Sequence, residues 1–231
     1  MQPSSIVLVE DDDALADLLC EYLGQHQFRV ERARSGDVGV ERILASPPDL
    51  VILDLFMPGM DGLAVCRTIR PRFAGPVLIL TASKSDADHV AGLEIGADDF
   101  VTKPIDPRIL LARIRTLLRR TSSATSNSND QHVIAIGPLR IDPALREVTF
   151  DGQPVELTTM EFDVLSMLAR ESGRVVTREE LYEKAAGVKY DGLDRGMDVH
   201  VSRIRKKLVG LGCDPRRLKS VRGTGYLLAF R

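Results

Sequence analysis

The sequence predicts an α/β protein of two domains: an open parallel sheet covered by helices on both faces, then a smaller α+β domain. Three observations favour this fold class. Five short strand-like segments alternate with helical stretches in the first half of the chain, as in doubly wound sheets. A segment rich in Ser, Thr and Asn follows at residues 121–131 and is typical of a flexible linker. Beyond it, short strands are followed by capped helices and a basic C-terminus.

Length and charge support this division. The chain has 231 residues, enough for two domains with a core each. Residues 1–122 carry 14 Lys and Arg against 18 Asp and Glu, whereas residues 133–231 carry 17 against 14. The last 37 residues, from Arg195, hold ten basic residues and two acids, a concentration that favours nucleic acid over membrane as a partner. We therefore expect domains at 1–120 and 132–231, joined by the linker at 121–131.

The compartment can be predicted from what is absent. Cys20, Cys66 and Cys213 are far apart and show no metal or redox spacing. No basic region with an apolar run opens the chain, and no stretch is long enough to span a bilayer. We expect a cytoplasmic protein with no membrane partner.

The first domain should contain five strand and helix pairs. Strands are predicted at 5–9, 29–33, 50–53, 77–81 and 99–102, and helices at 13–25, 37–45, 63–70, 86–95 and 106–120. In a five-stranded flavodoxin-like sheet, ligands bind at the carboxyl ends of the strands, where the strand order reverses between the first and third strands.

Acidic residues follow those two strands. Glu10 and Asp11 follow the first strand and Asp54 follows the third, so three carboxylates should meet in one crevice. Like charges this close need a cation, and oxygen ligands suit Mg²⁺ better than zinc. Thr81 and Lys103 end the fourth and fifth strands at the same edge. A carboxylate nucleophile, a metal, a hydroxyl and a lysine are suited to accepting a phosphoryl group, although each residue alone could equally be a cap, turn or surface residue.

Residues 5–120 resemble the receiver domain of bacterial response regulators, through the segments VLVEDD, LDLFMPGMDG, LTA and GADDFVTKP. The resemblance implies that a sensor histidine kinase phosphorylates Asp54. It also implies that Glu10, Asp11, Asp54 and the backbone carbonyl of Phe56 hold Mg²⁺. Thr81 and Phe100 occupy the family's switch positions, where Tyr is more usual than Phe, and the Lys103–Pro104 bond matches the family's cis peptide.

A dimer face is also implied. Charged residues of the fourth helix, fifth strand and fifth helix join two receivers of this kind when they are phosphorylated. Here that face carries Asp98, Asp99, Arg113, Arg115 and Arg120, and the alternative is a solvated surface of weak ion pairs. His89 and Ile109 stand where an Arg and a Glu commonly pair, so we expect one cross-interface ion pair to be missing.

The second domain opens with short strands and two capping boxes. Strands are expected at 133–136, 139–141, 147–150 and 155–157, with a turn at Asp151 and Gly152. Thr158 with Glu161 and Thr177 with Glu180 each predict a helix start. A third helix at 195–208 should bury a stripe formed by Met197, Val201, Ile204 and Leu208.

The opposite face of that third helix is expected to be basic. It should present Arg195, Val199, His200, Ser202, Arg203 and Lys206. A basic helix after a short helix and turn is typical of the helix-turn-helix, whose last helix enters the major groove. Strands at 218–221 and 226–230 flank a basic hairpin tip at Arg222, which could reach an adjacent minor groove. A merely solvated basic surface is the alternative.

From about residue 133 to the end, the chain resembles the winged-helix effector domain of the OmpR/PhoB subfamily, through DVHVSRIRKKL and SVRGTGY. The resemblance implies base or phosphate contacts by Arg195, Val199, His200 and Arg203, and wing contacts by Arg222, Thr224 and Tyr226. Ser202 stands where many members have Arg. The stretch KYDGLDR resembles RstA-type regulators, and residues 187–194 match the segment through which relatives contact RNA polymerase.

The predicted function is phosphorylation-dependent, sequence-specific DNA binding that regulates transcription. Phosphorylation should favour a homodimer on two adjacent half-sites. We expect no enzyme activity beyond the receiver's own phosphoryl transfer and dephosphorylation. An aspartyl-phosphate phosphatase is disfavoured because Phe56 replaces the acid usual two places after the nucleophile. A receiver that signals through a protein partner without phosphate is the remaining alternative.

Overall fold

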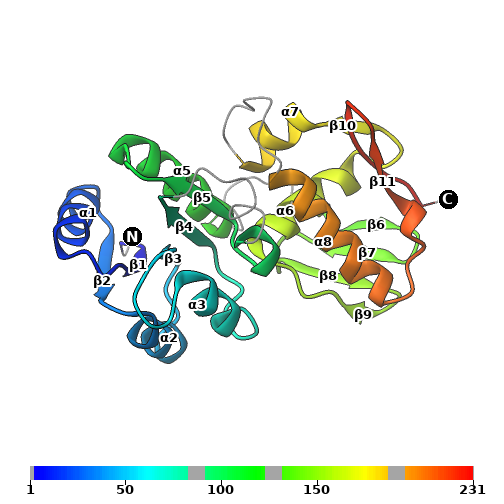
Figure 1. Ribbon diagram of the computed structural model, residues 1–231. Helices are drawn as coiled ribbons and strands as arrows, with labels where there is room; N and C mark the ends of the chain where they lie inside the picture. The colour runs from blue at the N-terminus through cyan, green and yellow to red at the C-terminus, as the bar shows by residue number, and fades with distance from the viewer. Residues whose placement is uncertain (1–2, 83–91, 123–131, 187–195, 231) are drawn as a thin grey trace. The chain divides into compact units, whose positions relative to one another are not determined.

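The computed structural model describes residues 3–82, 92–122, 132–186 and 196–230 (Figure 1). The chain divides into two compact units, Met1–Thr121 and Ser122–Arg231, which we call the N-unit and the C-unit. Most of the expected linker, at residues 123–131, lies outside the described residues. Within the described ranges, no helix combines the length and apolar character needed to cross a membrane.

The N-unit is built on a parallel sheet with the strand order β2-β1-β3-β4-β5. The strands are β1 (Ser5–Val9), β2 (Arg29–Ala33), β3 (Leu50–Asp54), β4 (Val77–Thr81) and β5 (Asp99–Thr102). This flavodoxin-like order was predicted from the sequence and is confirmed. The order reverses at β1 and β3, which pair in parallel with Val9 opposite Leu53. The residues that follow these two positions therefore leave the sheet side by side.

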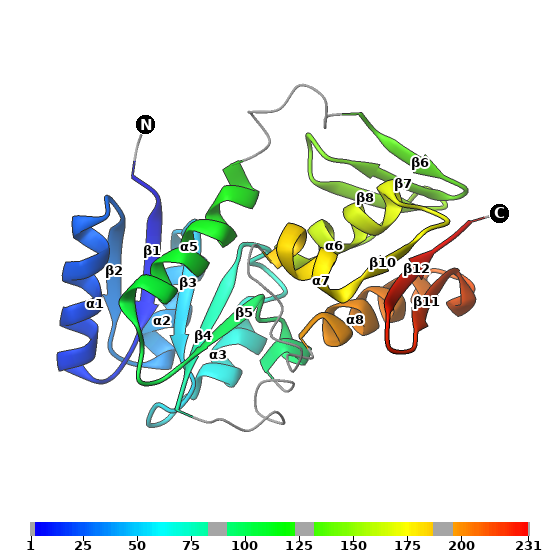
Figure 2. The same ribbon diagram turned by 90° about the horizontal axis from the view of Figure 1, so that it is seen from above.

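Helices cover both faces of this sheet (Figure 2). They are α1 (Asp13–Gln25), α2 (Gly36–Ala45), α3 (Gly62–Ile69) and α5 (Pro107–Ser122). Ile6 and Leu8 of β1 pack into a core with α1 and α5, while Val7 and Val9 pack into a second core with α2 and α3. This alternation follows from the two-residue period of a strand. Residues 92–95 are helical, whereas the rest of the helix expected at 86–95 lies outside the described range.

The C-unit begins with a four-stranded antiparallel sheet, β6 (Ile134–Ile136), β7 (Leu139–Asp142), β8 (Glu147–Phe150) and β9 (Gln153–Pro154). The strand predicted at 155–157 is wrong. Regular pairing ends at Pro154, although the Val155 N–H still donates to the Val148 carbonyl at 2.8 Å. The chain then turns inward, because Val155 is buried and Thr158 already caps the next helix.

Three helices and a second sheet complete the C-unit. They are α6 (Thr159–Arg170), α7 (Arg178–Leu181) with a π-helical turn η2 (Tyr182–Ala186), α8 (Gly196–Gly210), a 3₁₀ turn η3 (Pro215–Arg217) and the sheet β10 (Val175–Thr177), β12 (Gly225–Leu228) and β11 (Leu218–Val221). Both predicted capping boxes are present. The predicted stripe of α8 is buried in the core of the C-unit. The helices and the hairpin match the prediction, whereas most of the turn expected at 191–196 lies outside the described residues.

Candidate functional site

Three carboxylates meet at the carboxyl edge of the N-unit sheet. Glu10 follows β1, Asp54 ends β3, and oxygen atoms of Glu10, Asp11 and Asp54 lie within 4.8 Å of one another. Glu10 and Asp54 are buried, with exposures of 0% and 4%, whereas Asp11 is exposed. The strand register brings the two buried groups together, and Asp11 opens the cluster to solvent.

Lys103 lies against both buried carboxylates. Its Nζ is 2.9 Å from Asp54 Oδ1 and 3.0 Å from Glu10 Oε2. Lys103 directly follows β5, and its peptide bond to Pro104 is cis. Burial raises the pKa of Glu10, and the nearby Asp54 charge adds to this despite the hydrogen bond from Lys103. Burial works to lower the pKa of Lys103, but its contacts with Asp54 and Glu10 outweigh burial and raise it. The cluster is therefore an acidic pocket with one resident ammonium.

The donor set of this pocket fits a hard divalent cation. Its three acidic members offer only oxygen, and one of them is exposed to water, as suits Mg²⁺. Lys103 offsets part of the carboxylate charge. Phe56 directs its ring to solvent, where it is 56% exposed.

Arg32 is a neighbour of this pocket that the sequence analysis missed. Its Nη2 donates to the carbonyl oxygen of Glu10 at 3.1 Å and to that of Asp11 at 3.3 Å, and its Nη1 pairs with Asp13 at 2.6 Å. Arg32 therefore fixes the backbone that carries two of the carboxylates. Its position could be predicted only once β2 is known to lie beside β1, because the signal is the pairing of Leu8 with Arg32.

Thr81 and Phe100 line one small cavity beside the acidic pocket. Thr81 ends β4 and is 1% exposed, and Phe100 of β5 is half-buried. Leu55, Ile79 and Leu93 are among the other lining residues. The structure thus places the two predicted switch residues around a shared space.

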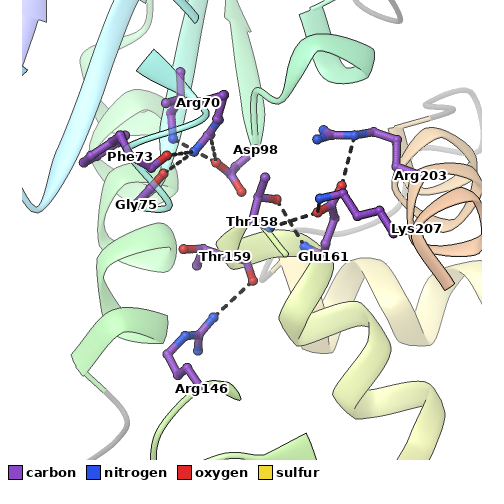
Figure 3. Close-up of polar contacts among 11 residues, drawn as sticks. Arg70, Phe73, Gly75, Asp98, Arg146, Thr158, Thr159, Glu161, Arg203 and Lys207 are labelled. Carbon is purple, nitrogen blue, oxygen red and sulfur yellow. Dashed lines mark hydrogen bonds and ion pairs between the residues drawn. The ribbon is translucent and has the colours of Figure 1, made fainter. Parts of the chain in front are cut away.

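The predicted dimer face needs one correction. Asp98 is 1% exposed, and its Oδ2 accepts the Val77 N–H at 2.9 Å and pairs with Arg70 at 2.5 Å (Figure 3). Its assignment to an accessible surface is therefore wrong, because the carboxylate balances Arg70 inside the N-unit. Asp99 pairs with Arg113 at 2.7 Å within the same unit.

Other members of that face are accessible or not described. Arg115 is exposed, and Ile109 is 52% exposed. The side chain of Arg120 and all of His89 lie outside the described residues.

The outward face of α8 differs from the prediction at His200. Ser202 and Lys206 are exposed, as expected for a DNA-facing surface. His200, however, is 2% exposed. It lies three residues after Met197 and four before Ile204, so helical spacing places it with the buried stripe, and its assignment to the opposite face is wrong. Val199 is buried as well, at 8% exposed, so its assignment to the opposite face is also wrong.

Several basic residues of α8 make contacts within the C-unit. Arg203 Nε is 3.0 Å from Glu161 Oε1, and Lys207 Nζ is 2.7 Å from Glu161 Oε2 (Figure 3). Arg205 donates to the Leu218 carbonyl at 2.8 Å. Counting the basic residues of α8 could not show which of them face DNA and which pair within the C-unit, because both roles use Arg and Lys on the same helix.

The hairpin tip between β11 and β12 carries the expected exposed residues, Arg222 and Thr224. Tyr226 is instead fully buried, and its hydroxyl donates to Asp198 of α8. Arg178 lies 5.1 Å from the Tyr226 ring centroid. Burial raises the pKa of the Tyr226 hydroxyl. Tyr226 as an exposed wing contact is therefore wrong, because it ties β12 to α8. Arg195 and the segment 187–194 lie outside the described residues.

Two family models match the chain. The response regulator receiver domain matches residues 6–115, and the C-terminal domain of transcriptional regulatory proteins matches residues 152–228. The chain is 41% identical to the transcriptional regulatory protein RstA of Escherichia coli K12, over 98% of each chain. It is 41% identical to the sensory transduction protein RegX3 of Mycolicibacterium smegmatis, over 97% of this chain and 99% of the relative.

One solved structure covers nearly all of the chain. The C128S mutant of RitR matches with a TM-score of 0.77 and 26% identity, covering 97% of this chain and 98% of that one.

Proposed function

The chain belongs to the OmpR/PhoB family of two-component response regulators, and on that premise we propose that phosphorylation of Asp54 controls its binding to DNA. Relatives with the same two domains are transcriptional regulators. The observation that carries the proposal is the meeting of Glu10, Asp11, Asp54 and Lys103 at one sheet edge. This edge offers a nucleophile, a cation site and an ammonium within contact distance.

In the proposed reaction, an Asp54 oxygen attacks the phosphorus of a kinase phosphohistidine. The new P–O bond forms as the P–N bond breaks, and the electron pair of that bond returns to the imidazole nitrogen. Lys103 offsets the charge on the phosphoryl oxygens from its position 2.9 Å from Asp54. Mg²⁺ held by Glu10, Asp11, Asp54 and the Phe56 carbonyl would supply further charge neutralisation. The same site would later release the phosphoryl group to water.

The phosphorylated state acts on the switch residues. Thr81 and Phe100 line the cavity beside the pocket, so a hydroxyl drawn toward phosphate changes the space available to the ring. We assign the resulting dimer face to Asp99, Arg113, Arg115 and Arg120. A dimer places two C-units on adjacent half-sites, and this raises the effective concentration of the second DNA contact.

DNA contacts are assigned to Arg203 of α8 and to Arg222 and Thr224 of the hairpin tip, which are at least partly accessible. Arg195, which lies outside the described residues, is assigned to DNA as well. The segment 187–194 is assigned a contact with RNA polymerase. Because a bacterial regulator binds the chromosome, we place the protein in the cytoplasm.

Beryllofluoride, a phosphoryl mimic, tests the proposal with Mg²⁺ present. The wild-type protein should dimerise, measured by analytical ultracentrifugation, and should bind a selected DNA duplex more tightly. Asp54→Asn should respond in neither assay. A response of the same size in both proteins would exclude Asp54 as the acceptor. No response from either would favour a receiver that signals through a protein partner without phosphate.

A further inference from the structure

Glu161 is a fully buried carboxylate shared by two helices. It occupies the first turn of α6, is 0% exposed, and accepts the Thr158 N–H at 2.8 Å. The same side chain contacts two residues of α8: Arg203 Nε lies 3.0 Å from Oε1 and Lys207 Nζ lies 2.7 Å from Oε2 (Figure 3). One carboxylate therefore holds α8 at two points one helical turn apart.

A capping role alone does not explain these contacts. The chain holds a second capping box, Thr177 with Glu180, in which the glutamate is 30% exposed at its side chain and pairs with Arg174 at 3.1 Å. A buried charge is costly unless it is paired and hydrogen-bonded, and Glu161 obtains its partners from α8. Its burial is thus linked to the placement of α8.

The contact with Arg203 uses a particular nitrogen. Nε faces Glu161, whereas Figure 3 shows the terminal nitrogens of the guanidinium extending away from it. The forked terminal nitrogens suit bidentate contact with O6 and N7 of guanine. Arg203 also lies beside the exposed Ser202, at the edge of the accessible face of α8. This contact is an ion pair, and it favours orientations of the guanidinium that keep Nε beside the carboxylate.

We propose that Glu161 is a positioning residue for base readout, which holds Arg203 in the orientation that recognises a guanine. The inference rests on the proposed contact of Arg203 with DNA. Glu161 itself does not touch the nucleic acid. Lys207 anchors the same carboxylate, and its Nζ also donates to the Glu156 carbonyl at 2.7 Å, so the side chain that orients Arg203 is itself fixed.

The test measures base preference with full-length protein. Selection from a randomised duplex library gives the preferred site, and dissociation constants are then measured for that duplex and each single-base-pair variant. Arg203→Ala should abolish preference at one base pair. Glu161→Gln keeps the side-chain shape and removes the charge. It should lower preference at that same base pair by about fivefold or more, within the range for one bidentate contact. The double variant should be no worse than Arg203→Ala.

Glu180→Gln is the matched control, because it neutralises the glutamate of the other capping box, and it should leave base preference unchanged. Circular dichroism melting reports whether each variant folds. If Glu161→Gln is unfolded, Glu161→Asp serves instead, since it retains the charge but withdraws it by one methylene.

An unchanged preference, or a uniform loss at all base pairs, in the folded Glu161 variant would overturn the positioning role while leaving the Arg203 contact intact. If Arg203→Ala had no base-specific effect, neither the DNA contact of Arg203 nor the positioning role of Glu161 would stand.

Discussion

At the scale of single residues, the acidic pocket holds more carboxylate charge than its one ammonium can balance. A bound cation would balance the remainder. Glu10 and Asp54 are buried beside each other, and one ammonium, Lys103, contacts both. Two carboxylates against one half-buried cation leave a negative excess in a poorly solvated place. Selection for metal and phosphoryl binding explains such an arrangement better than selection for stability.

The raised pKa of Glu10 has a consequence for stability. A folded pKa above the ordinary value of 4.5 means that the folded chain binds this proton more tightly than the unfolded chain. The contribution of this proton to the free energy of unfolding is fully present below about pH 4.5, and it is lost as pH rises through the raised pKa of Glu10. Glu10→Gln should therefore raise the unfolding midpoint of the metal-free protein at pH 7 but not at pH 4. Thermal melts in chelator measure this.

Glu21→Gln is the control for that experiment, because Glu21 is an exposed glutamate of α1. It should leave the midpoint nearly unchanged at both pH values. A lower midpoint for Glu10→Gln at pH 7 would show that the Lys103 contact outweighs the burial of the carboxylate.

At the scale of secondary structure, the boundaries of the N-unit strands could be predicted closely because most are short runs rich in apolar residues that end at or just before a polar residue. β2, with three charged residues, is the exception, and its place followed from the alternation of strands with helical stretches. The convergence of Glu10 with Asp54 followed from the fold class. Arg32 could not be found, since its role depends on which strand neighbours β1. His200 was misplaced because the basic composition of α8 was weighed above its helical spacing. The strand at 155–157 was predicted because Val155 is apolar. Val155 is buried, but strand pairing ends at Pro154, so the apolar residue packs into the core without continuing a strand.

The start of α3 constrains the end of β3. A Cβ at Gly62 would lie 2.2 Å from the Asp54 carbonyl oxygen, so any side chain there must displace the strand end that carries Asp54. Gly62→Ala should destabilise the protein by about 1–3 kcal/mol, as overpacking does, and should weaken its beryllofluoride response. Urea unfolding and the dimerisation assay measure the two effects.

Gly24→Ala provides the comparison, because a Cβ at Gly24 in α1 meets nothing within 4 Å. Alanine there should be neutral or stabilising by up to about 1 kcal/mol. Equal behaviour of the two variants would mean that β3 can shift without cost to the phosphoacceptor site.

At the scale of the whole molecule, each unit has a core of its own. The N-unit packs one core on each face of its sheet, one with α1 and α5 and the other with α2 and α3. The C-unit packs its two sheets, α6, α7 and α8 around a single core. Separate cores permit each unit to fold and unfold as a cooperative body, so a ligand of one unit need not stabilise the other.

Calorimetry should therefore resolve two unfolding transitions in the full-length protein. On the proposed function, Mg²⁺ with beryllofluoride binds the folded N-unit at Asp54, so it should raise the midpoint of one transition and leave the other in place. At 100 times the dissociation constant, the added stability is about 2.7 kcal/mol. Asp54→Asn should show two transitions with no ligand shift, which separates binding at this site from general ionic effects. If both midpoints of the wild-type protein rose together, the two units would unfold as one body, and phosphorylation would act on DNA binding through the stability of the C-unit as well as through dimerisation.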